Sequence, residues 1–111
     1  MSISLFIVLA IIWVHWLADF VLQTDKMAKT KSTSNAWLGY HISVYTAVLM
    51  IFGWKYALVN GALHFCTDWV TSRITSRLWK EQRVHDFFVV IGIDQAIHFT
   101  CLLLTIPLMG W

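Results

Sequence analysis

Long apolar stretches alternate with short polar connections along this chain. The four stretches run from about Ile3 to Gln23, from Ala36 to Phe52, from Tyr56 to Thr71 and from Phe87 to Met109. A helix that crosses about 30 Å of hydrocarbon needs roughly 20 predominantly apolar residues. The pattern predicts an all-α membrane protein, built as a bundle of four transmembrane helices in a single domain over residues 1–111.

Carboxylate and imidazole side chains interrupt the apolar stretches at a regular spacing. Three His/Asp pairs are four residues apart, and a further histidine stands alone. Residues four apart project from the same face of a helix, and a buried Asp or His in a bilayer usually faces the interior of a bundle. We therefore expect one buried polar cluster formed by His15/Asp19, His41, His64/Asp68 and Asp94/His98.

The basic residues set the expected orientation. They gather in the first connection and after the third stretch, which we expect to continue as an amphipathic helix, whereas the second connection offers only Lys55. Because positively charged connections stay in the cytoplasm, both termini are expected on the non-cytoplasmic side of the inner (plasma) membrane. The polar cluster then lies in the inner-leaflet half. The basic residues concerned are Lys26, Lys29, Lys31, Arg73, Arg77, Lys80 and Arg83.

The composition agrees with a membrane protein. Hydrophobic residues make up 59% of the chain and charged residues only 13%, which argues against a soluble globular protein. The net charge of +2 gives no reason to expect a nucleic-acid partner. Membrane lipid is the expected partner, and the sequence leaves a homo-oligomer open. Cys66 and Cys101 form no CxxC unit, so we expect them to behave as small hydrophobes.

The residue types of the polar cluster favour a metal centre. Imidazole and carboxylate are ligands for zinc, iron and manganese, and a pair four residues apart supplies two ligands from one helix. Seven candidates, more than one tetrahedral ion needs, predict one or two divalent ions held by His15, Asp19, His41, His64, Asp68, Asp94 and His98. The same residues would also suit a hydrogen-bonded structural network, or a proton relay or transport path without a metal.

One motif is distinctive enough to suggest a family. The run HWLADFVLQTD begins at His15 and is followed by Lys29, His41, the His64/Asp68 pair and the run DQAIH, which begins at Asp94. This order resembles the small bacterial and phage membrane proteins catalogued as domain of unknown function 3307. The resemblance implies the helical architecture and the buried centre, but no particular reaction. The chain also resembles, more loosely, membrane-bound proteins of the metal-dependent hydrolase type.

Two classes of function follow. The first is a metal-dependent hydrolase that acts on a lipid-linked or amphiphilic substrate, with Asp19 or Asp94 as general base and Arg73 against a substrate phosphate. The alternative is a non-catalytic small transporter, an ion- or proton-handling protein, or a phage-type membrane effector. A centre that opens to a groove would favour the hydrolase, whereas a continuous polar path across the bundle would favour transport.

Overall fold

A computed structural model describes residues 4–110 and confirms the all-α prediction, because this part of the chain contains helices and no strand. The elements, in chain order, are α1 (Leu5–Trp16), the π-helical turn η1 (Leu17–Val21), α2 (Asp25–Thr30), α3 (Asn35–Leu49), the 3-10 turn η2 (Met50–Phe52), α4 (Trp54–Lys80), α5 (Val84–Leu104) and the 3-10 turn η3 (Ile106–Leu108). The predicted start of the first stretch, Ile3, lies outside the described residues.

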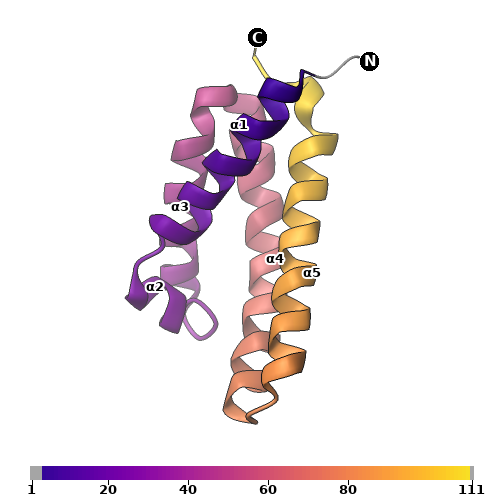
Figure 1. Ribbon diagram of the computed structural model, residues 1–111. Coiled ribbons are helices and arrows are strands. Elements are labelled where there is room, and N and C mark those ends of the chain that lie inside the picture. Colours follow the sequence, from indigo (N-terminus) through magenta and orange to yellow (C-terminus); the bar gives the residue numbers. More distant parts are fainter. Residues whose placement is uncertain (1–3, 111) are drawn as a thin grey trace.

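The helices form an elongated bundle. The two longest, α4 and α5, run antiparallel side by side, and α3 packs along α4 while α1 crosses the bundle over them (Figure 1). The start of α1, the α3–α4 connection and the end of α5 lie together at one end, which we call the apolar end. The basic end contains α2 and the α4–α5 connection (Figure 1).

Local chemistry explains where several helices begin. The hydroxyls of Thr24 and Ser34 accept hydrogen bonds from backbone N–H groups three residues later, which caps α2 and α3. Gly53 separates η2 from α4 at φ 117°, a conformation that side chains disfavour. A Cβ at Gly53 would also lie 2.6 Å from the Gly110 nitrogen, so this turn requires glycine.

The helix lengths do not support the predicted four membrane spans. By length and composition, one helix among the described residues suffices to cross a membrane: α5, over Val84–Leu104. The apolar segment Leu5–Val21 is shorter. The predicted extension of the third stretch is present, since α4 continues to Lys80. The sequence did not predict α2, which lies within the polar first connection.

Polar and apolar side chains are distributed in an unusual way. Within residues 4–110, eleven polar or charged residues are buried, as many as the buried hydrophobic ones. The outer surface instead carries large apolar side chains on every long helix, including Phe6, Trp13, Phe20, Tyr40, Ile51, Leu58, Val70, Ile74, Phe88, Ile93 and Leu104. Single exposed apolar residues are ordinary, but coverage of this extent is not.

The apolar end contains the hydrophobic core. Ile11, Leu49, Phe52 and Leu102 are each about 1% exposed or less. The few polar groups there have partners: the Tyr56 hydroxyl donates to the Leu102 carbonyl at 2.8 Å. The Asn60 amide donates to the Tyr56 carbonyl at 2.9 Å and to Thr105 Oγ1 at 2.8 Å. Among the described residues, these polar groups of the apolar end are therefore satisfied within the protein.

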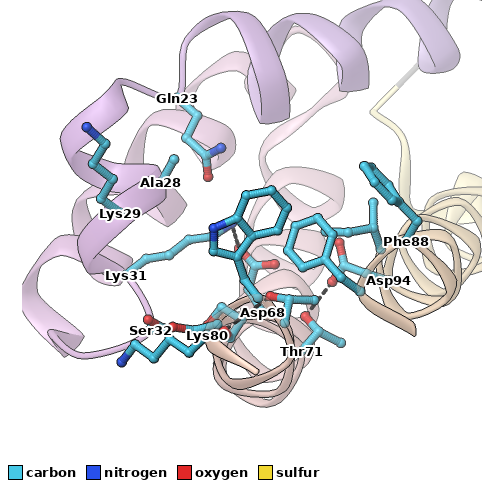
Figure 2. A pocket seen from close by; sticks show the side chains of 16 residues that line it. Gln23, Ala28, Lys29, Lys31, Ser32, Asp68, Thr71, Lys80, Phe88 and Asp94 are labelled. Atoms are coloured by element: carbon cyan, nitrogen blue, oxygen red, sulfur yellow. Dashed lines mark hydrogen bonds and ion pairs between the residues drawn. The ribbon is translucent and has the colours of Figure 1, made fainter. Parts of the chain in front are cut away.

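A cavity of about 570 Å³ lies between the hydrophobic core and the basic end of the bundle. Its walls come from the segment around α2, from α4 and from the first half of α5 (Figure 2). Asp68 of α4 and Asp94 of α5 line it, and both side chains are almost fully buried. The cavity therefore reaches from the surface to the interior of the bundle.

Candidate metal centre

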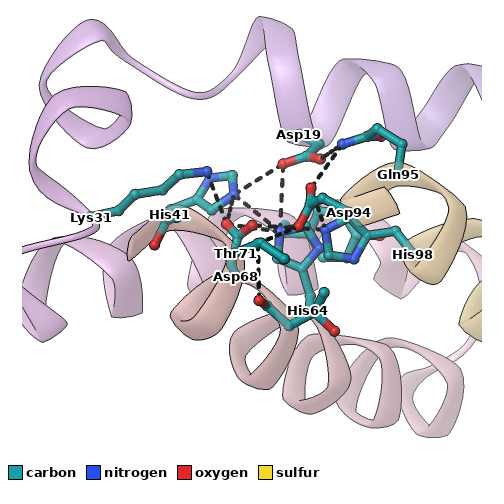
Figure 3. Close-up of polar contacts among 12 residues, drawn as sticks. Asp19, Lys31, His41, His64, Asp68, Thr71, Asp94, Gln95 and His98 are labelled. Carbon is teal, nitrogen blue, oxygen red and sulfur yellow. Dashed lines mark hydrogen bonds and ion pairs between the residues drawn. The ribbon is translucent and has the colours of Figure 1, made fainter. Parts of the chain in front are cut away.

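All seven predicted ligands are buried in the middle of the bundle, where four long segments meet. Each is at most 6% exposed. They arrive from α1, η1, α3, α4 and α5. The members that Figure 3 labels turn their polar atoms toward one another. The sequence prediction of one shared polar cluster thus agrees with the geometry. Whether each member ligates a metal stays a prediction.

Four of these side chains form a compact group. His41, His64, Asp19 and Asp68 each offer one ligand atom, and all four atoms lie within 4.8 Å of one another. His41 Nε2 is 3.2 Å from His64 Nε2 and 3.1 Å from Asp19 Oδ1. His64 Nε2 is 3.5 Å from Asp19 Oδ1, and Asp68 Oδ2 is 3.5 Å from both ring nitrogens.

These distances are those of a metal-ligand shell. A tetrahedral ion with bonds of about 2.0 Å separates its ligand atoms by about 3.3 Å. Five separations in the group fall between 3.1 and 3.5 Å. Two Nε2 atoms that face each other at 3.2 Å can share only one proton, whereas a cation between them would satisfy both lone pairs.

The outer nitrogens of the same two rings support this arrangement. Nδ1 of His41 and Nδ1 of His64 are buried and have no hydrogen-bond partner within residues 4–110. A histidine that ligates through Nε2 carries its proton on Nδ1. The four residues present therefore fit a divalent ion of the zinc, iron or manganese type, because the Nε2 atoms face the group and each Nδ1 atom can carry the ring proton.

A second group adjoins the first. Asp19, Asp94 and His98 also place their ligand atoms within 4.8 Å of one another. His98 Nε2 lies 3.1 Å from Asp94 Oδ2 and 3.8 Å from Asp68 Oδ1. Asp19 belongs to both groups, and the two oxygens of Asp68 face one group each. Shared carboxylates of this kind suit two neighbouring ions.

Asp19 owes its position to a local irregularity. It lies in η1, where the backbone widens to a π-turn and the Leu22 N–H donates to the Leu17 carbonyl at 2.9 Å. Single π-turns inside helices are frequent at functional sites. Apolar periodicity gives no sign of such a turn, so the sequence could not have revealed it.

The chain also matches a known protein family. The family model described as "Protein of unknown function (DUF3307)" matches residues 5–110. This chain belongs to that family. The resemblance drawn from its motifs is thereby confirmed. No curated protein and no solved structure matched the chain.

In this DUF3307 chain, His15 occupies a position beside the two groups. It belongs to neither group of close ligand atoms among the described residues. Its Nδ1 is 2.9 Å from the Tyr45 hydroxyl, and its Nε2 is 2.8 Å from Oε1 of Gln95. Both ring nitrogens therefore have protein partners, which suits a residue that orients the cluster.

Gln95 forms the hydrogen bonds between helices that its position beside Asp94 predicts. Its amide nitrogen donates to Asp19 Oδ2 and to Asp94 Oδ2, each at 3.1 Å (Figure 3). Through its Oε1 it also contacts His15, so it connects that ring with two carboxylates of the cluster. Thr71 adds a further support, since its hydroxyl lies 2.6 Å from Asp94 Oδ1. Such outer partners fix the orientation of ligands.

Two basic side chains, Lys31 and Arg73, make contacts that the sequence did not predict. Lys31, interpreted from the sequence as a topology residue, reaches inward and donates to Asp68 Oδ2 at 2.9 Å. Arg73, predicted to act on a substrate phosphate, donates to the Trp69 carbonyl at 2.7 Å and to Asn35 at 3.1 Å, and its role toward a substrate stays a prediction. Its guanidinium also stacks on the Trp69 ring, 4.0 Å from the centroid. Arg73 is not among the residues that line the cavity.

Proposed function

We propose that this DUF3307 chain is a membrane-embedded, metal-dependent hydrolase of a lipid-linked or amphiphilic substrate. The observation that carries the proposal is that Asp68 and Asp94 belong both to the buried cluster and to the wall of the cavity that opens to the surface. A catalytic metal needs a coordination position that substrate can reach, whereas a structural metal is closed on all sides.

The distribution of side chains supports the membrane location. Apolar groups cover the outside of every long helix while the interior holds the acids and histidines. Such a surface is costly in water and favourable against lipid tails. We propose that the bundle acts as one unit in the inner membrane, with the basic end toward the cytoplasm and both termini outside.

Reporter fusions test that orientation. A reporter inserted beside Lys29 should be cytoplasmic, and one beside Lys55, at the apolar end, should be external. The reverse result, or release of the full-length chain from membranes by high salt alone, would contradict the proposal.

The residues divide the chemistry among them. His41, His64, Asp19 and Asp68 would hold the ion, which when bound supplies Lewis-acid activation of water for hydrolysis. Asp94 borders the cavity, and its two oxygens are held by Thr71 and Gln95. We assign Asp94 the role of general base, because it is positioned beside the place where substrate enters.

The packing of the apolar end disfavours the transport alternative. A conducting path would have to continue from the cluster past Ile11, Leu49 and Leu102. These side chains are each about 1% exposed or less and belong to one packed core. The cluster is open toward one end of the bundle, as a hydrolase needs, and a dry core covers it at the other.

Elemental analysis is the direct test. Protein purified in mild detergent without a chelator should contain about one equivalent or more of zinc, iron or manganese. Less than about a tenth of an equivalent of any such metal would favour a hydrogen-bonded network and contradict the hydrolase. The readout depends on no assumption about the substrate.

A further inference from the structure

Two kinds of side chain line the cavity. Three lysines, Lys29, Lys31 and Lys80, line it together with a series of hydroxyls on α4. Trp79, Phe87, Phe88 and Ile91 add an apolar surface. A wall that combines cationic and hydroxyl donors with a large apolar face is suited to a ligand that has an anionic head and an apolar tail.

Ser72 gives an independent sign that a ligand belongs there. Its side chain is 6% exposed and lines the cavity. Its hydroxyl oxygen has no hydrogen-bond partner within residues 4–110, although most buried hydroxyls have one. Gln23 Oε1 is likewise buried without a partner in this part of the chain and lines the same cavity. These two groups are available to a ligand.

Lys31 joins the cavity to the metal-ligand cluster. It lines the cavity while its ammonium lies 2.9 Å from Asp68 Oδ2 (Figure 2). The charge of Asp68 is thereby neutralised on the cavity side, and Asp94 is engaged by Thr71. An incoming anion would therefore meet lysines and hydroxyls before it meets an uncompensated carboxylate.

We propose that this cavity binds the phosphate group of a phosphorylated amphiphile. The phosphate lies on the lysine and hydroxyl side, with Ser72 as a donor, and the apolar chain lies against Trp79, Phe87 and Phe88. The volume of about 570 Å³ is within the usual range for small-molecule sites. This inference rests on the proposed hydrolase and deepens it by naming the substrate class. It replaces Arg73 with lysines as the phosphate-binding residues.

Binding measurements on the detergent-purified full chain test the proposal. Three probes are titrated by calorimetry: dihexanoylphosphatidic acid, dihexanoylphosphatidylcholine and inorganic phosphate. The phosphatidic acid should bind at least about tenfold more tightly than either of the others, because only it combines an exposed phosphate with apolar chains. Equal binding of the two lipids would overturn the phosphate assignment. Equal binding of inorganic phosphate would identify free phosphate as the ligand and overturn the amphiphile.

Two double variants with the same change of charge sharpen the result. Lys29→Gln/Lys80→Gln removes two exposed lysines of the cavity and should weaken phosphatidic acid binding about tenfold or more. Lys26→Gln/Lys55→Gln removes two lysines that do not line the cavity and should leave binding unchanged. If both double variants weakened phosphatidic acid binding equally, the binding would reflect general charge attraction, and the proposed phosphate site would be contradicted.

The metal content of the same samples separates the two proposals. Lysine-dependent binding in protein that holds no metal would retain the phosphate site and exclude the metal-dependent hydrolase. Metal in the expected amount without discrimination between the lipids would retain the metal centre and exclude the phosphate site.

Discussion

Two buried regions of this bundle differ in how completely they satisfy themselves. At the apolar end, Tyr56, Asn60 and Thr105 all have hydrogen-bond partners inside a packed core. In the middle and toward the basic end, the buried atoms without a hydrogen-bond partner within residues 4–110 include Gln23 Oε1, His41 Nδ1, His64 Nδ1 and Ser72 Oγ. The described residues of the apolar end satisfy their buried polar groups among themselves, whereas the other half leaves buried polar atoms for which we propose ions and a ligand as partners.

The difference teaches where stability and chemistry are located. Buried polar groups without partners cost free energy, so a fold retains them when something else compensates. The long helices α4 and α5 pass through both regions, and the packed half can therefore hold the polar half in place. Substitutions should affect metal binding in one half and the free energy of unfolding in the other.

The largest effect is expected from His64→Ala in the polar half. His64 contributes Nε2 to the four-residue group and stacks on His98, with the ring centroids 3.9 Å apart. The variant should lose nearly all bound metal and should unfold more easily, because metal binding and folding share free energy. Elemental analysis and a thermal melt measure both effects.

Tyr56→Phe is the matched control in the apolar half. It removes one buried hydrogen bond, to the Leu102 carbonyl, and should cost about 1 kcal/mol of stability with the metal content unchanged. Full metal occupancy in His64→Ala would show that the ligands lie elsewhere.

The second prediction concerns Leu49→Ala, in the core of the apolar end. Leu49 is 0% exposed, and its truncation should lower the free energy of unfolding by about 2–5 kcal/mol through the cavity left behind. Denaturant titration in micelles measures this, and the folded variant should keep its full metal content. Loss of metal well before unfolding would show that the two halves are coupled and would break the comparison.

The smallest effect is expected from Thr71→Val, which leaves every proposed ligand in place. The variant removes the hydroxyl that lies 2.6 Å from Asp94 Oδ1, and Asp94 is the proposed general base rather than a ligand of the ion. The roughly tenfold loss of metal affinity that follows removal of a ligand's outer partner should therefore be absent. Competition with a chromophoric chelator measures the affinity. The control is Thr67→Val, one turn earlier, where the hydroxyl bonds only the Leu63 carbonyl. A clearly weaker affinity in Thr71→Val than in Thr67→Val would make Asp94 a metal ligand and contradict its role as general base.

The sequence revealed the parts of this site that depend on one helix at a time. Pairs such as His64/Asp68 share a helix face because of helical geometry, and apolar surroundings indicate that the face is buried. The same reasoning gave the helical class and the extension of α4 to Lys80.

Other features depend on neighbours that periodicity does not identify. Lys31 reaches Asp68 because the first connection contains α2, whose start is set by the Thr24 cap. His15 shares a face with Asp19, but Tyr45 and Gln95 from other helices engage its ring. The cavity likewise results from packing among three segments. Local pattern therefore predicted which residues meet, but not how they divide the roles.

The π-turn at Leu17–Val21 has a consequence for how this segment tolerates change over evolution. A π-turn contains one residue more than an α-turn, so removing a residue there would rewind the helix and rotate α1 by about 100° relative to Asp19. Three of its side chains, Leu17, Phe20 and Val21, are 39–51% exposed and can exchange for other apolar residues. Deletion of Leu17, which lies between α1 and Asp19, should abolish metal binding, whereas Leu17→Met should not. We therefore expect selection on this segment to act more strongly on the number of residues than on their identity.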